Sequence, residues 1–261
     1  HAKPSRTQKM DWFMAHITSA CRFFLFLTST IVMLVGCSTD PQTNRSRPML
    51  VTQSKEAEVG TKAFRQFLND PKIIVIKDTP VQERVSQVFA RLVTAAKHSA
   101  YAEHAKTLEW EVVLVEDARR SNTFSFPGGK VGVYTGLLPF ATTDGELAGA
   151  LGHSVASILA RHPGERISKS ALNQLGQSFF GPGGSSLLGF SNQPAVDPAL
   201  IKLHQEEADK VGILLAAEAG YDPDEAFRMG VKIFGPGPRL DALREYLPEA
   251  RTHYNASWSE A

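Results

Sequence analysis

Two predicted helices carry the side chains with the clearest potential for chemistry. The first contains His153, followed by Ser154 and, four residues after the histidine, by Ser157. The second contains Gln205 and, four residues later, Asp209. Residues four apart share one face of a helix, so the members of each pair can act at one site.

The segments around these helices resemble one protein family in several places and in the same order. Residues 122–138 read NTFSFPGGKVGVYTGLL, residues 146–153 read ELAGALGH, residues 207–209 read EAD, and residues 219–223 read AGYDP. Each is similar to a motif of the HtpX/BepA-like zinc metallopeptidases: the hairpin before the active-site helix, the zinc-binding helix, the second metal-binding helix and the turn after it. The resemblance covers roughly residues 55–255.

This resemblance implies an α+β, zincin-like metallopeptidase fold, mainly helical, with a small sheet and an edge hairpin. It also implies zinc as the cofactor. In the family, an H-E-x-x-H motif supplies two zinc ligands and the general base, and a glutamate four residues before an aspartate on the second helix supplies the third ligand. The fourth zinc position remains open for water or substrate.

The chain departs from that pattern at the positions that do the chemistry. The motif reads His153-Ser-Val-Ala-Ser157, so only the first histidine remains. Ser154 stands at the base position and cannot take a proton from water near neutral pH, and Ser157 offers a neutral hydroxyl that zinc binds poorly. Gln205 stands at the third ligand position with a neutral carbonyl. No catalytic residue is intact, and we expect no bound cofactor.

Without a metal, the residues that remain have ordinary structural roles. A lone histidine such as His153 is more often a hydrogen-bonded, partly buried side chain than a ligand, and Asp209, which supports the metal ligands in the family, is expected to accept a hydrogen bond between helices. His162, nine residues after His153, is predicted to lie on the opposite side of the same helix. Neither it nor His204, which adjoins Gln205, is expected to replace a lost ligand.

Three functions remain open. The first is a pseudopeptidase that binds polypeptide clients in a chaperone-like role, with Gly132, Val133 and Tyr134 as the strand that pairs with a client, because strand pairing needs no metal. The second is an active zinc metalloendopeptidase with a noncanonical site. The third is a purely structural protein without a ligand.

The pattern of apolar residues predicts the elements that position this site. Strand-like runs come early, and the signal Pro127-Gly-Gly129 joins two of them as a hairpin. Strands are predicted at residues 109–115, 121–126 and 130–135, and helices at residues 54–68, 80–98, 143–169, 198–219, 223–234 and 240–254. Residues 176–189, rich in Gly, Ser and Phe, are predicted to form a long loop.

The start of the chain has the features of an export signal. Arg22 precedes the apolar run 23–35, which is too short to span a bilayer as a helix. The sequence Leu-Val-Gly-Cys37 resembles the lipobox of bacterial lipoprotein precursors, which implies that Cys37 carries lipid. A buried helix with an incidental cysteine is the alternative. The polar residues 38–44 favour the export signal, because they are typical of a solvated tether.

These features divide the chain into a leader and signal peptide at residues 1–36, the lipidated cysteine and tether at residues 37–54, and a metallopeptidase-like domain at residues 55–261. Ser38 after Cys37 favours the outer membrane of the bacterial cell envelope, with the domain facing the periplasm. The chain carries 28 Lys and Arg residues against 27 Asp and Glu residues. This small net charge gives no indication of nucleic acid as a partner. The sequence leaves the oligomeric state open.

Overall fold

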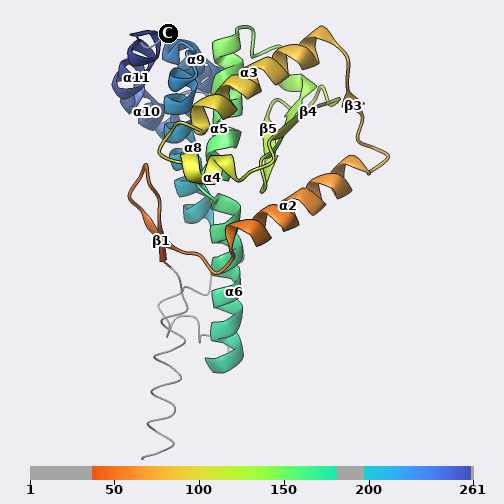
Figure 1. The fold of residues 1–261 in the computed structure, drawn as a ribbon, viewed down its shortest axis with the longest axis vertical. Coiled ribbons are helices and arrows are strands. Elements are labelled where there is room, and N and C mark those ends of the chain that lie inside the picture. Colours follow the sequence, from red (N-terminus) through yellow and green to blue (C-terminus); the bar gives the residue numbers. More distant parts are fainter. Residues whose placement is uncertain (1–36, 181–196, 260–261) are drawn as a thin grey trace, which may run out of the picture.

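The computed structural model describes residues 37–180 and 197–259, in which a four-stranded sheet packs against a group of helices (Figure 1). The sheet has the order β3-β4-β6-β5. It consists of β3 (Val75–Ile76), β4 (Glu111–Val115), β5 (Thr123–Phe126) and β6 (Lys130–Tyr134). The β4–β6 pair is parallel, and the two outer pairs are antiparallel. The predicted α+β fold, mainly helical with a small sheet, is confirmed.

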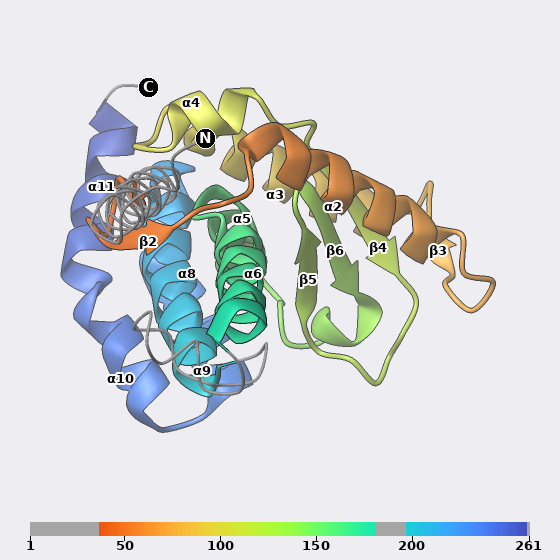
Figure 2. The same ribbon diagram turned by 90° about the horizontal axis from the view of Figure 1, so that it is seen from below.

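The two faces of the sheet are covered by different helices. On one face lies α2 (Gln53–Leu68) (Figure 2). Its Phe64 and Phe67 contact the rings of Phe124 and Phe126. The opposite face carries Val131 and Val133, which join the main core with α3 (Pro80–Ala96) and α5 (Asp144–Leu159). This alternation along β5 and β6 is the period of two that a sheet covered on both faces requires.

The remaining helices follow in chain order. They are α4 (Ala102–Lys106), α6 (His162–Phe180), α8 (Pro198–Glu218), α9 (Pro223–Phe234), α10 (Pro238–Glu245) and α11 (Leu247–Ser259), with a 3-10 turn at Thr135–Leu137. The segment predicted as one helix at residues 240–254 is two helices, α10 and α11. The loop predicted at residues 176–189 is wrong for its first part, because α6 continues to Phe180; residues 181–196 lie outside the described residues.

The helix predicted at residues 143–169 is also broken, which moves His162 away from its predicted place. Arg161 has a left-handed backbone, with φ of 53°, and Pro163 opens the next helix. A buried ion pair stabilises the break, because Arg161 Nε donates to Glu56 Oε2 of α2 at 2.9 Å and the same carboxylate accepts from the Gly164 backbone. His162 therefore belongs to α6 and not to the far side of α5.

Residues 37–48, predicted as part of a solvated tether, form a hairpin that packs on the body of the protein. Its strands are β1 (Cys37–Thr39) and β2 (Ser46–Pro48). Asp40 in the turn is fully buried, where it accepts hydrogen bonds from Tyr101 Oη at 2.7 Å and from Arg47 Nη2 at 3.0 Å. The polar composition predicted solvation, but these polar groups find partners within the protein.

A second buried network, which we call the Arg45 cluster, holds the hairpin against α6 and α8. It consists of Arg45, His162, Glu165, His204 and Glu207. The Arg45 guanidinium binds both carboxylates, with Nη2 at 2.6 Å from Glu165 Oε2 and Nε at 2.5 Å from Glu207 Oε1. His162 donates to Glu207 and His204 donates to Glu165, each at 3.0 Å, and the two imidazole rings stack 4.2 Å apart.

The Arg45 cluster makes folding sensitive to acid. Burial lowers the pKa of His162 to about 4, below the usual value of about 6.5 that the unfolded chain would show. Burial also opposes ionisation of Glu207, but its hydrogen bonds from His162 and Arg45 bring the pKa of its carboxyl to about 2. For both groups the unfolded chain binds more protons below pH 6.5, so the free energy of unfolding falls as the pH falls.

We therefore expect the wild-type domain to lose stability progressively between pH 6.5 and pH 4, with His162 alone contributing on the order of 3 kcal/mol across its pKa shift. His162→Gln removes this titration. Urea denaturation at a series of pH values should give a shallower dependence for the variant than for wild type. Equal slopes for the two proteins would contradict the assignment of His162 as a neutral buried group.

Candidate active site

The candidate site lies where α5 and α8 pack in opposite directions. Gly152 and Gly212 meet at the closest point, where a Cβ added to Gly212 would lie 2.7 Å from the backbone nitrogen of His153. One residue along α5, His153 Nδ1 lies 2.7 Å from Asp209 Oδ1 of α8. Ser157 and Gln205 are four residues from this pair on each helix, so they lie one turn further along the same contact.

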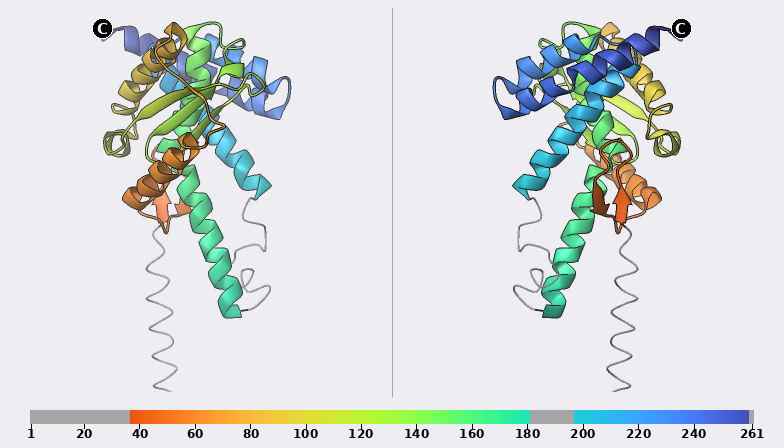
Figure 3. Two further views of the ribbon diagram at one scale, coloured as in Figure 1. Left: turned by 90° about the vertical axis from the view of Figure 1, so that its right-hand side faces the viewer. Right: turned by 90° about the vertical axis from the view of Figure 1, so that its left-hand side faces the viewer.

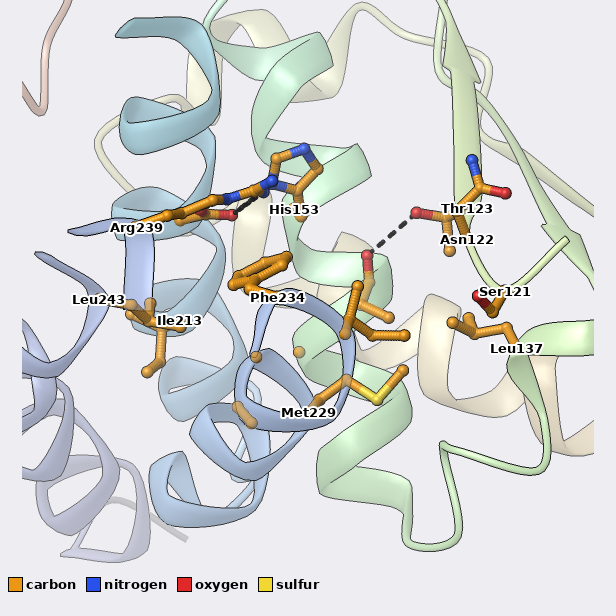
Figure 4. A pocket seen from close by; sticks show the side chains of 16 residues that line it. Ser121, Asn122, Thr123, Leu137, His153, Ile213, Met229, Phe234, Arg239 and Leu243 are labelled. Carbon is orange, nitrogen blue, oxygen red and sulfur yellow. Dashed lines mark hydrogen bonds and ion pairs between the residues drawn. The ribbon is translucent and has the colours of Figure 1, made fainter. Parts of the chain in front are cut away.

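Arg239, at the start of α10, completes the arrangement around Asp209 (Figure 4). Its Nε donates to Asp209 Oδ2 at 2.6 Å and its Nη2 donates to Oδ1 at 2.9 Å, and the guanidinium lies 3.7 Å from the centre of the Phe234 ring. Burial alone would raise the pKa of Asp209, but the hydrogen bonds from Arg239 and His153 hold it below its usual value. A fixed cation therefore neutralises the buried carboxylate next to His153.

A cavity of about 230 Å³ opens beside these residues. His153, whose side chain is 32% exposed, lines it together with Asp209 and Arg239. Its remaining wall is mostly apolar and includes Leu137, Ile213, Met229, Ile233, Phe234 and Leu243, with Asn122 and Thr123 at the start of β5. A cavity of this composition has room for an apolar side chain beside a polar rim.

Ser154, at the base position of the family motif, faces the sheet. It is buried, and its Oγ donates to Thr123 Oγ1 at 2.7 Å. Thr123 Oγ1 in turn donates to the carbonyl of Ala150 at 3.3 Å (Figure 4). This chain of hydroxyls joins the start of β5 to α5. Ser154 therefore positions the strand that borders the cavity.

The edge strand beside the cavity is β5, so the prediction that Gly132, Val133 and Tyr134 form a strand open to pairing is wrong. These three residues lie in β6, which is paired with β4 on one side and with β5 on the other and is buried along its length. Tyr134 N donates to Asn122 O. Since inward and outward residues alternate in an antiparallel pair, the backbone groups of Thr123 and Ser125 point away from β6 toward the free edge.

The donor set does not fit zinc. Ser157 and Gln205 are neutral, and the carboxylate bonded to His153, Asp209, is occupied by Arg239, whose positive charge opposes a dication. Across residues 37–180 and 197–259 there is no group of three or more His, Cys, Asp or Glu side chains that could hold a metal ion. We derive no hydrolytic step through a metal at this site.

Sequence reasoning did not find Arg239, Phe234 or the Arg45 cluster. Arg239 follows the short connection after α9, and nothing in the sequence pairs it with Asp209. The Arg45 cluster does have a signal, since His162 and Glu165 are three residues apart and so are His204 and Glu207. Two such pairs on facing helices can meet side by side. Both pairs lie outside the ligand positions of the family motif.

A motif helix beside an edge strand, crossed by a second helix that carries an aspartate, defines a zincin-like metallopeptidase fold. The model of "Peptidase family M48" matches residues 81–247. The chain belongs to peptidase family M48, and the predicted relationship to the HtpX/BepA-like metallopeptidases is confirmed. The family is zinc-dependent. The hairpin β1–β2 and α2 lie outside the matched residues.

The relatives that match this chain include mitochondrial and bacterial proteins. The chain is 26% identical over 200 residues to "Mitochondrial metalloendopeptidase OMA1" of Saccharomyces cerevisiae, an alignment that covers 72% of this chain and 56% of that protein. It is 35% identical over 156 residues to the Arabidopsis thaliana protein of the same name, covering 58% and 31%. It is 23% identical over 235 residues to "Beta-barrel assembly-enhancing protease" of Escherichia coli strain K12, covering 83% and 46%. The chain thus spans only part of each relative.

The close contact of α5 with α8 predicts a strong effect of one added methyl group. In Gly212→Ala the new Cβ would meet the α5 backbone, which cannot move without separating the helices, so we expect a loss of roughly 1–3 kcal/mol in the free energy of unfolding. In the control Gly230→Ala the closest atom to the new Cβ would be the end of the Leu243 side chain at 2.8 Å, and its three nearest neighbours are all side-chain atoms. Because alanine favours helices by about 1 kcal/mol over glycine, the control should be neutral or slightly stabilising in the same denaturation assay.

Proposed function

We propose that the chain is a catalytically inactive member of its family that binds extended polypeptides along the free edge of β5, in a chaperone-like role. The observation that carries this proposal is the pairing of Arg239 with Asp209 beside His153, because it puts a cation and two neutral side chains where the family holds zinc. The proposed binding surface does not depend on zinc. The outward backbone groups of Thr123 and Ser125 and the apolar cavity need no metal to accept a polypeptide.

The proposed setting is the bacterial cell envelope, with the domain anchored by a lipid on Cys37 and facing the periplasm at the outer membrane. The lipobox-like sequence before Cys37 supports this proposal, and so does the resemblance to a bacterial protease whose name refers to β-barrel assembly. No helix among the described residues is long and apolar enough to cross a membrane.

A second candidate is an active zinc metalloendopeptidase with a noncanonical site. The relatives named as metalloendopeptidases favour it. It requires ligands that the described residues do not bring together around His153. Metal content separates this candidate from the first.

We expect the purified domain to bind zinc at much less than one equivalent, and a chelator to leave its melting temperature unchanged, because a metal bound only to the folded state would raise it. Ser157→His with Gln205→Glu should raise zinc affinity, and Ser154→Glu is needed in addition for hydrolysis. Metal analysis and a peptidase assay measure the two effects. Stoichiometric zinc in the wild type, lost in His153→Ala, would refute the inactive assignment.

A register control accompanies this test. Glu206 follows Gln205 directly, so a tight zinc site in Ser157→His alone would mean that Glu206 faces α5 and that the ligand position is displaced by one residue. A folded double variant that binds no zinc would show that Ser157 and Gln205 do not face each other.

The β5 edge predicts a specific effect of proline on client binding. In Ser125→Pro the outward N–H is lost, while the ladder to β6 keeps all its hydrogen bonds, as proline on an edge strand allows. We expect the affinity for a short fluorescent peptide of alternating apolar and polar residues to fall roughly tenfold, since one such bond and the added ring together cost about 1.4 kcal/mol. Fluorescence anisotropy measures the affinity.

The matched control is Ser125→Ala, which removes the hydroxyl and keeps the backbone donor. It should bind the peptide as the wild type does. Equal binding by the proline and alanine variants would exclude the β5 edge as the client site.

A further inference from the structure

The hairpin β1–β2 connects Cys37 to the body of the protein without a flexible linker. Cys37 is paired in the ladder with Pro48, and Ser38 is paired with Arg47. Both Asp40, in the turn, and Arg47, in β2, are buried. The backbone of the cysteine is therefore part of the folded structure.

Two separate polar networks fix the hairpin to different elements. Asp40 binds Tyr101, which precedes α4, and Arg45 binds Glu165 of α6 and Glu207 of α8. Thr43 Oγ1 adds a hydrogen bond to Glu207 at 3.2 Å. Removing one partner of a buried ion pair costs roughly 3–5 kcal/mol. The hairpin is therefore held in one orientation on the body of the protein. The position of Cys37 is thus fixed relative to α6 and α8.

The hairpin and α6 lie on the same side of the molecule. α6 projects away from the body beside β1 and β2, and two views at right angles agree on this (Figures 1 and 3). The backbone of Leu50, just after β2, donates to Ser168 Oγ of α6 at 2.8 Å. Ile167 precedes Ser168 in α6, so Leu50 and Ile167 belong to segments that touch, and both are exposed large apolar residues, at 37% and 43%.

We propose that this face, made of the hairpin β1–β2, Leu50 and Ile167, lies directly on the lipid bilayer that holds the anchor. The inference rests on lipidation of Cys37 in the proposed function. Cys37 lies in a strand that packs on the protein. Acyl chains attached to it therefore begin at the protein surface and not at the end of a flexible tether. The residues beside that strand must then meet the bilayer, and exposed Leu and Ile side chains gain free energy when they enter its interface.

Fluorescent labels on single cysteines test this orientation in the full chain, expressed in its membrane and transferred to vesicles that contain a nitroxide-labelled lipid as quencher. The labelled variants are Leu50→Cys and Ile167→Cys. The control is Glu83→Cys, because Glu83 is exposed and its neighbour Arg84 pairs with Asp144 at the other end of α5. We expect severalfold stronger quenching at positions 50 and 167 than at position 83.

Sedimentation of the same samples separates the two proposals. If the protein sediments with the vesicles and all three labels are quenched alike, the orientation is refuted while the anchor stands. If the wild type fails to sediment, or if Cys37→Ser sediments as the wild type does, the anchor itself is refuted.

Undocking the hairpin provides a second readout. Arg45→Gln should leave the protein on the vesicles but reduce quenching at position 167, because the domain then moves on a loose segment. Should this variant fail to fold, Tyr101→Phe weakens the other network by one hydrogen bond and should act in the same direction. Unchanged quenching in a folded Arg45→Gln variant would refute the claim that the hairpin sets the orientation.

Discussion

The close packing of α5 on α8 is the constraint on which the candidate site depends. Gly152 and Gly212 allow the two backbones to approach until a single Cβ would be too large. That approach places His153 within hydrogen-bonding distance of Asp209, and it brings Ser157 and Gln205 to the same contact one turn further along. The arrangement is a property of packing and does not need a metal. This explains how the fold of a metallopeptidase family can persist with Ser157 and Gln205 at the positions predicted for two of the ligands.

Buried acidic side chains are likewise balanced by residues of the protein itself. Asp209 is neutralised by Arg239, and Glu165 and Glu207 share Arg45. A buried carboxylate without a partner costs several kcal/mol, whereas a paired one with good hydrogen bonds is tolerated. The protein therefore uses arginines from short segments, the hairpin turn and the start of α10, to compensate acidic side chains on its long helices. Both arginines lie where elements from different parts of the chain meet.

Sequence patterns predicted the elements that local chemistry determines and missed those that distant contacts determine. The bounds of α9 agree with the prediction because Pro223 opens the helix and Gly235 ends it. The break at Arg161 was missed because the left-handed residue is stabilised by Glu56, 105 residues away. The hairpin was missed for a similar reason, since Asp40 is buried only through Tyr101 and Arg47.

The edge strand was misassigned because the parallel pairing of β4 with β6 cannot be inferred from the hairpin alone. The departures from H-E-x-x-H are visible in the sequence, but the cation at Arg239 required the fold.

The length of β5 limits how tightly a client could be held. With only Thr123 and Ser125 facing outward, the free edge offers two N–H donors and two carbonyl acceptors. At about 1 kcal/mol net for each hydrogen bond, the backbone contacts supply roughly 4 kcal/mol before the entropic cost of ordering the client is subtracted. A dissociation constant of about 1 mM corresponds to that free energy. Any tighter complex would have to draw its affinity from the apolar cavity, so residence on this edge would be brief and selectivity would come from the side chain that enters the cavity.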